Sequence, residues 1–173
     1  MSSDGHVVLV GLMGAGKTSV GRLLAQALGW RFVDTDDLVE ADAGRSMAEL
    51  FATEGEARFR ALEVEVLAAE LAAPEPSVVA TGGGVVTTET GRAMLRAHHP
   101  VVLLAVSPEV AARRVGDGTS RPLLAGDPRA RLSELAEARG EAYREVADEV
   151  VDVDERSPGQ VVGALLEILE KAS

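Results

Sequence analysis

The stretch VVLVGLMGAGKTS, residues 7–19, decides the fold, because it joins an apolar run, a glycine-rich turn and a helix start. Residues 11–18 fit the pattern G-x-x-x-x-G-K-[ST] at every fixed position. Glycines in such a turn let backbone N–H groups point inward, and the following helix N-terminus adds partial positive charge. The stretch therefore predicts a strand, an anion-binding loop and a helix, in that order.

The loop is expected to hold the phosphates of a nucleoside triphosphate, with Lys17 on the β and γ phosphates and Thr18 on Mg²⁺. The chain has only two lysines, Lys17 and Lys171, against fifteen arginines. A lysine kept in such a chain indicates a need for a compact point charge. A glycine-rich turn with a lysine by chance is the alternative. The nucleotide-binding loop is expected to consist of Gly14, Ala15, Gly16, Lys17, Thr18 and Ser19.

Composition limits the function classes. The 173 residues suit one domain spanning 1–173, and 46% of them are hydrophobic. The net charge of −11 is unfavourable for nucleic acid, which basic patches recognise. There is no cysteine, and no apolar run approaches transmembrane length. The N-terminus lacks the basic region of a signal peptide, so we expect a cytoplasmic protein with no nucleic-acid or membrane partner.

Apolar runs and helical patterns alternate along the chain, which is typical of a parallel sheet with helices on both faces. Ser46 and Thr53 each begin a capping-box pattern, and the second is expected to open a long helix. His98 and His99 are expected to be exposed. The expected strands are 7–10, 32–34, 78–80, 101–106 and 150–153. The expected helices are 17–28, 53–73, 89–98, one starting near 107, 129–146 and one after 158.

Ligands of such sheets bind at the carboxyl ends of the strands. Asp34 and Asp36 follow the second strand, and residues two apart on an extended chain face the same side. We expect one carboxylate to bind Mg²⁺ through water and the other to accept a proton from a hydroxyl. Asp37 is expected to cap the next helix. The alternative is that all three acids serve as caps.

Three consecutive glycines, Gly82, Gly83 and Gly84, follow the third strand. Glycine loses the most backbone entropy on folding and gives a core nothing to pack. Either the segment is a flexible loop, or a ligand lies directly against its backbone. The chain contains no asparagine, which excludes the N-K-x-D motif of guanine-specific proteins.

Taken together, these segments resemble the shikimate kinase family over nearly the whole chain. The shared segments are VGLMGAGKTSVGRLLA, FVDTD, GRSMAELFATEGEARFRALE, VVATGGGVV, RPLL, a late Arg-x-x-x-Tyr helix and a C-terminal S-P-G-Q. The resemblance implies a three-layer α/β fold with a five-stranded parallel sheet in the order 2-3-1-4-5. It also implies phosphoryl transfer from ATP to the 3-hydroxyl of shikimate.

The resemblance implies roles for individual residues. Asp34 resembles the metal-side acid and Asp36 the acid that binds the substrate hydroxyl. Arg60 and Arg139 resemble the pair that grips the substrate carboxylate, and Glu63 the acid that positions Arg60. Gly82–Gly84 would form the wall where the γ-phosphate meets the substrate, because any Cβ there would push a ligand away.

A lid and an adenine side are implied as well. The lid is expected over about 116–128 and would carry Arg121 to the phosphates. Arg114 and Arg156 resemble adenine-side residues, and the substrate-binding region is expected over about 34–63. Phe51 and Phe59 resemble apolar walls beside the substrate ring. We expect a monomer.

Two other readings stay open from the residues. A gluconate-type kinase of the same fold need not aim two arginines at a ring carboxylate. A nucleotide-binding regulatory module without turnover is the second, although Lys17, Asp34 and Asp36 are intact. Without the resemblance, Arg60 would be interpreted as pairing with Glu56 and Glu63 on a helix surface, and Arg139 as part of a solvated helix face.

Overall fold

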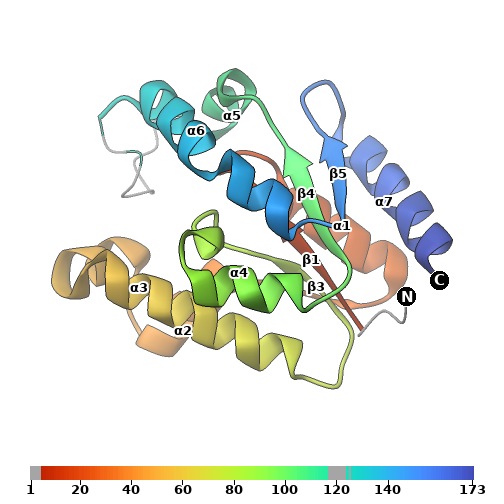
Figure 1. Ribbon diagram of the computed structural model, residues 1–173, viewed down its shortest axis with the longest axis horizontal. Coiled ribbons are helices and arrows are strands. Elements are labelled where there is room, and N and C mark those ends of the chain that lie inside the picture. Colours follow the sequence, from red (N-terminus) through yellow and green to blue (C-terminus); the bar gives the residue numbers. More distant parts are fainter. Residues whose placement is uncertain (1–4, 117–123, 125) are drawn as a thin grey trace.

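A computed structural model describes residues 5–116, 124 and 126–173 of the chain (Figure 1). Its centre is a parallel five-stranded sheet in the order β2-β3-β1-β4-β5, which confirms the predicted fold class. The strands are β1 His6–Val10, β2 Arg31–Asp34, β3 Ser77–Ala80, β4 Val101–Ala105 and β5 Glu149–Asp152.

Helices cover both faces of the sheet. In Figure 1, α1 and α7 lie on one side, and α3, α4 and α6 lie on the other. The helices are α1 Lys17–Leu28, α2 Thr35–Ala43, α3 Met47–Leu71, α4 Glu89–Arg96, α5 Pro108–Val115, α6 Pro128–Val146 and α7 Pro158–Ala172, and a 3₁₀ turn, η1, spans Val85–Thr87. None of the helices in these described ranges combines the length and apolar character that crossing a membrane requires.

The alternation of β1 explains the three layers. Val7 and Leu9 pack into a core with α1 and α7, whereas Val8 and Val10 pack into a second core with α3, α4 and α6. Successive residues of a strand face opposite sides, so a strand covered on both faces must be apolar throughout. All five residues of β1 are buried.

Side-chain caps fix several helix starts. Ser107 caps α5, and Ser157 forms a reciprocal capping box with Gln160 at the start of α7. Ser46 caps α3 by accepting from the Glu49 N–H. The predicted cap at Thr53 is wrong, because its hydroxyl donates to the Glu49 carbonyl inside the helix.

The helical path of α3 is instead interrupted at Gly55, whose φ of 79° and ψ of 172° are not helical. A left-handed φ suits glycine, which has no Cβ to clash. The break therefore falls two residues after the predicted helix start. The long helical segment that follows carries Arg60 and Glu63.

Smaller predictions also change. The helix expected to 98 ends at Arg96, and the strand expected to 106 ends at Ala105. His98 is buried and its Nε2 lies 3.1 Å from the His6 carbonyl, so the expected exposure of His98 is wrong. His99 is exposed as predicted.

Candidate active site

A cleft of about 470 Å³ lies at the carboxyl ends of the strands, as the parallel topology requires. The phosphate loop forms one wall, and the loops after β2, β3 and β5 form the others. Residues lining it include Gly14, Ala15, Gly16, Lys17, Thr18, Ser19, Asp34, Asp36, Gly83, Arg114 and Arg156. Most residues predicted for nucleotide and metal binding are therefore brought together in one cleft.

The phosphate loop has the backbone that an anion site needs. Gly14 and Gly16 have φ values of 83° and 89°, which glycine adopts without steric cost. Gly16 is the N-cap of α1 and offers no side chain, and the first turn of α1 contains no acid. The first N–H groups of α1 are therefore left for a ligand, with the helix dipole behind them.

Lys17 lies across its own loop. Its Nζ donates to the carbonyls of Gly11 and Leu12, at 2.5 and 3.1 Å. These bonds hold the ammonium group at the cleft wall. Burial raises the pKa of Glu63, and the charge of Lys17 is one of those that oppose this shift.

The Thr18 hydroxyl and the Asp34 carboxylate lie next to each other beside the phosphate loop and form a pair of oxygen ligands. The Thr18 hydroxyl donates to Asp34 Oδ2 at 2.9 Å, while Asp34 Oδ1 accepts from the Asp36 N–H at 2.9 Å. Asp34 is thus the N-cap of α2, as the alternative held for this residue, whereas Asp37 lies in the first turn of the helix and not at its cap. The extended geometry expected at Asp36 is wrong, because α2 begins at Thr35.

A Mg²⁺ ion fits this oxygen pair. Magnesium prefers hard oxygen ligands and is often held by one or two protein oxygens together with substrate phosphates and waters. Thr18 and Asp34 supply a hydroxyl and a carboxylate at the mouth of the phosphate loop. In the described ranges, no three His, Asp or Glu side chains gather into a group that could bind a metal by themselves.

Arg60 makes both ion pairs of the surface-pair alternative, but it is buried, so that alternative is wrong about its exposure. Only 6% of it is exposed, and its guanidinium pairs with Glu63 at 2.8 Å and with Glu56 at 3.3 Å. Glu63 itself is 1% exposed. Burial raises the pKa of Glu63 above its ordinary value, and the neighbouring Arg60 guanidinium opposes that shift. Glu63 and Arg60 therefore form a buried ion pair.

Arg139 is also buried, with 5% of its surface exposed. Its Nη1 lies near Gly83 and has no hydrogen-bond partner among the described residues. One helical turn later, the Tyr143 hydroxyl donates to the Gly83 carbonyl. The predicted carboxylate pair, Arg60 and Arg139, thus flanks the glycine segment from α3 and α6.

The glycine segment is needed for space, not for backbone conformation. None of its three glycines has a positive φ. A Cβ on Gly82 would lie 1.9 Å from Glu63 Oε1 and 2.8 Å from Asp36 Oδ1. A Cβ on Gly84 would lie 2.1 Å from Arg60 Cζ. The missing Cβ atoms of Gly82 and Gly84 therefore leave room for three side chains of the site itself, Glu63, Asp36 and Arg60.

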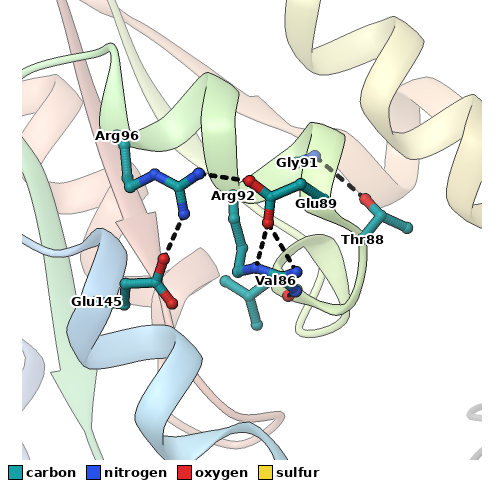
Figure 2. A network of polar contacts seen from close by, with 7 residues as sticks. All are labelled: Val86, Thr88, Glu89, Gly91, Arg92, Arg96 and Glu145. Atoms are coloured by element: carbon teal, nitrogen blue, oxygen red, sulfur yellow. Dashed lines mark hydrogen bonds and ion pairs between the residues drawn. The ribbon is translucent and has the colours of Figure 1, made fainter.

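An ion-pair network on α4 and α6 holds η1, the turn that follows the glycines (Figure 2). Arg92 donates to the Val86 carbonyl of η1 at 2.7 Å and to Glu89 at 2.9 Å. Arg96 links Glu89 on α4 to Glu145 on α6. Exposed ion pairs stabilise little individually, but the network joins η1, α4 and α6.

Arg114 and Arg156 both line the cleft. The Arg114 guanidinium donates to the carbonyls of Gly14, at 3.2 Å, and Val153, at 3.0 Å, and so bridges the phosphate loop to the loop after β5. Arg121 and most of the expected lid lie outside the described residues. Phe51 and Phe59 lie together, with ring centroids 4.9 Å apart, and Phe59 is buried.

Two contacts of the site were missed from the sequence. Thr35 is buried, and its hydroxyl accepts the Gly82 N–H at 2.9 Å. The second is Tyr143, whose hydroxyl donates to the Gly83 carbonyl of the glycine segment. A signal for Tyr143 was present, because it stands four residues after Arg139 and so lies on the same helix face.

Comparison with known proteins gives a consistent result. The sequence model of the family described as shikimate kinase matches residues 13–170. A shikimate kinase from Symbiobacterium thermophilum is 50% identical over 169 residues, which cover 96% of this chain and 97% of that relative.

Solved structures separate the two kinase alternatives. Shikimate kinase from Acinetobacter baumannii in complex with shikimate is 36% identical, with a TM-score of 0.92, covering 97% of this chain and 94% of that chain. A gluconokinase from Sinorhizobium meliloti is 24% identical with a TM-score of 0.58, over 98% of each chain, and shares the fold alone.

Proposed function

The chain belongs to the shikimate kinase family, and from that premise we propose that it transfers the γ-phosphoryl group of ATP to the 3-hydroxyl of shikimate. One observation supports this most. Asp36, Arg60 and Arg139 gather around the glycine segment, directly beside the phosphate loop. An acid for a hydroxyl and two guanidinium groups for a carboxylate match a small hydroxy acid placed next to a triphosphate.

The nucleotide occupies the loop side of the cleft. The N–H groups of 14–19 and Lys17 bind the phosphates, and Arg114 and Arg156 flank the adenine. Thr18 and Asp34 would hold Mg²⁺ at the mouth of the phosphate loop. When bound, the metal ion neutralises developing charge on the phosphate oxygens.

Arg60 and Arg139 hold the shikimate carboxylate. A planar guanidinium matches a carboxylate bidentately, and burial strengthens such contacts relative to water. Glu63 and Glu56 fix the position of Arg60, so little ordering remains to be done on binding. Phe51 and Phe59 supply apolar surface beside the ring.

The chemical step is an in-line displacement. The 3-hydroxyl oxygen forms a bond to the γ-phosphorus, while the bond from that phosphorus to the β–γ bridging oxygen breaks and ADP leaves. Asp36, which lines the cleft, orients the hydroxyl and can accept its proton. Lys17 stabilises charge on the transferred group, and positioning supplies most of the acceleration.

The segment 116–128 is assigned as a lid that brings Arg121 to the phosphates. This assignment is supported by the Gly, Pro and Asp content of the segment and by the Arg-Pro-Leu-Leu motif. Lid closure excludes water and so limits hydrolysis of ATP. We further assign the protein to the cytoplasm as a single-domain monomer that binds no nucleic acid.

A coupled ATP-consumption assay with shikimate and gluconate side by side tests the proposal. Shikimate should support Mg²⁺-dependent turnover and give shikimate 3-phosphate, with gluconate near background. Turnover of gluconate alone would reject the substrate assignment. Binding of ATP without turnover of either acid would favour the regulatory-module alternative.

A further inference from the structure

Most backbone groups of the glycine segment are already used. The Gly82 N–H donates to the Thr35 hydroxyl at 2.9 Å, and the Gly82 carbonyl accepts from the Val85 N–H at 3.2 Å. The Gly84 carbonyl accepts from both the N–H and the hydroxyl of Thr87, at 3.0 and 2.6 Å. Within the described part of the chain, the N–H groups of Gly83 and Gly84 donate to no protein acceptor.

The peptide between Gly83 and Gly84 is the weakest point of this segment. Its C=O and N–H point in opposite directions because the peptide is planar and trans. Neither neighbour has a Cβ, so the plane can rotate with little steric resistance. A rotated peptide would turn the Gly83 carbonyl to where the Gly84 N–H had been, and a carbonyl oxygen repels an anionic ligand.

One side chain holds the Gly83 carbonyl. The Tyr143 hydroxyl donates to this carbonyl. Tyr143 lies on α6, is 4% exposed and packs in the core against the sheet and α4. We propose that Tyr143 is a positioning residue that locks the Gly83–Gly84 peptide, so that the Gly84 N–H, which has no protein acceptor among the described residues, stays available to the bound shikimate. The inference rests on the proposed function and adds a determinant of its substrate binding.

Helix α6 thereby supplies two parts of the site. Arg139 and Tyr143 stand one turn apart, and a Cβ on Gly83 would lie 3.4 Å from Arg139 Nη1 and 3.5 Å from the Tyr143 hydroxyl. A shift of α6 would move the carboxylate ligand and the peptide lock together. Burial raises the pKa of Tyr143 and Glu63 acts in the same direction, whereas the Arg139 and Arg60 guanidinium groups oppose the shift, so the phenol stays protonated at neutral pH and can donate.

The variant Tyr143→Phe removes the hydroxyl and keeps the ring. We expect kcat/KM for shikimate to fall about tenfold, the effect of one neutral hydrogen bond, while the ATP KM stays unchanged. Thr87→Val is the matched control. It removes the hydroxyl that donates to the Gly84 carbonyl, but that carbonyl keeps the Thr87 N–H as a second donor. Its kinetics should match wild type, and equal losses in both variants would reject a specific role.

Amide NMR gives a readout that a merely structural role would not move. In Tyr143→Phe without ligand, the Gly84 amide signal should broaden through peptide rotation, whereas the Gly82 amide, held by Thr35, should not. This readout does not depend on turnover, so it decides the lock even if shikimate proves not to be the substrate. A sharp Gly84 signal together with unchanged shikimate kinetics would overturn the proposal.

Because Tyr143 is the only tyrosine, a second test avoids any folding defect of the variant. Growth on 3-fluorotyrosine labels this position alone and makes its phenol more acidic. A phenolate cannot donate to the Gly83 carbonyl. As the pH rises, we expect shikimate kcat/KM to be lost at a lower pH in the fluorinated protein than in wild type. In the fluorinated protein this loss should follow the ionisation of the phenol, which the ¹⁹F chemical shift reports. Identical pH profiles would contradict the lock.

Discussion

The substitution Gly84→Ala tests whether the glycine segment makes room for side chains of the site. The new Cβ would lie 2.1 Å from Arg60 Cζ, whereas ordinary contact begins at 3.4 Å, so the guanidinium must move by 3.4 − 2.1 = 1.3 Å to reach ordinary contact. The backbone of Gly84, with φ −94° and ψ 6°, is accessible to alanine, so the strain falls on Arg60. Misplacing a binding group by about 1 Å costs on the order of a hundredfold.

We therefore expect Gly84→Ala to fold and to raise the shikimate KM by about thirty- to a hundredfold, with the ATP KM nearly unchanged. Steady-state kinetics and thermal unfolding measure the two effects. The control is Gly83→Ala, one residue away, whose Cβ would meet its nearest neighbour, Arg139 Nη1, at 3.4 Å. If Gly83→Ala loses as much as Gly84→Ala, the glycines serve the ligand directly and the argument from Arg60 fails.

Three further predictions concern single side chains. Lys17→Met should keep its circular dichroism spectrum and lose about a hundredfold or more in kcat, and near-normal kcat would reject the phosphate-loop assignment. Arg139→Lys should raise the shikimate KM about thirty- to a hundredfold and leave the ATP KM alone, because lysine cannot bind a carboxylate bidentately; an unchanged KM would refute the clamp. Because burial raises the pKa of Glu63, its contribution to stability is present below about pH 4.5 and is lost as the pH rises through the folded-state pKa. As the pH rises, the free energy of unfolding of Glu63→Gln, measured in urea, should therefore fall less than that of wild type. Parallel curves of the two proteins against pH would contradict the raised pKa of Glu63.

The parts of the fold that local sequence determines were predictable. The strand, loop and helix of residues 6–28 follow from one apolar run, one glycine pattern and Gly29 as the stop. Between Thr53 and Gly55 two local signals competed, and the glycine prevailed because only it adopts the observed φ without strain. The sheet order was available only from the family resemblance, because strand periodicity does not encode which strands are neighbours.

The site was predictable as a set of residues but not as a set of contacts. Asp36 reaches the cleft although residues 34–36 do not form the predicted extended segment. Asp34 caps the start of α2, and the first turn of that helix directs the Asp36 carboxylate into the cleft. The space that Gly84 leaves is filled by Arg60, twenty-four residues earlier on α3. Such pairings depend on how helices pack across the sheet, which no local pattern records.

The buried atoms without partners describe the ligand that would complete the site. In the described part of the chain, the only buried side-chain nitrogen and oxygen atoms without a hydrogen-bond partner are Arg60 Nε, Arg139 Nη1 and Glu63 Oε1. Each such atom costs about 1–3 kcal/mol, so their concentration here marks stability given up for binding. A carboxylate can accept from the two donors, and a hydroxyl can donate to the acceptor. Shikimate carries both groups on one ring, whereas open-chain gluconate must lose internal rotation to present them at the same fixed positions. The same three atoms thus favour the cyclic hydroxy acid over the flexible one.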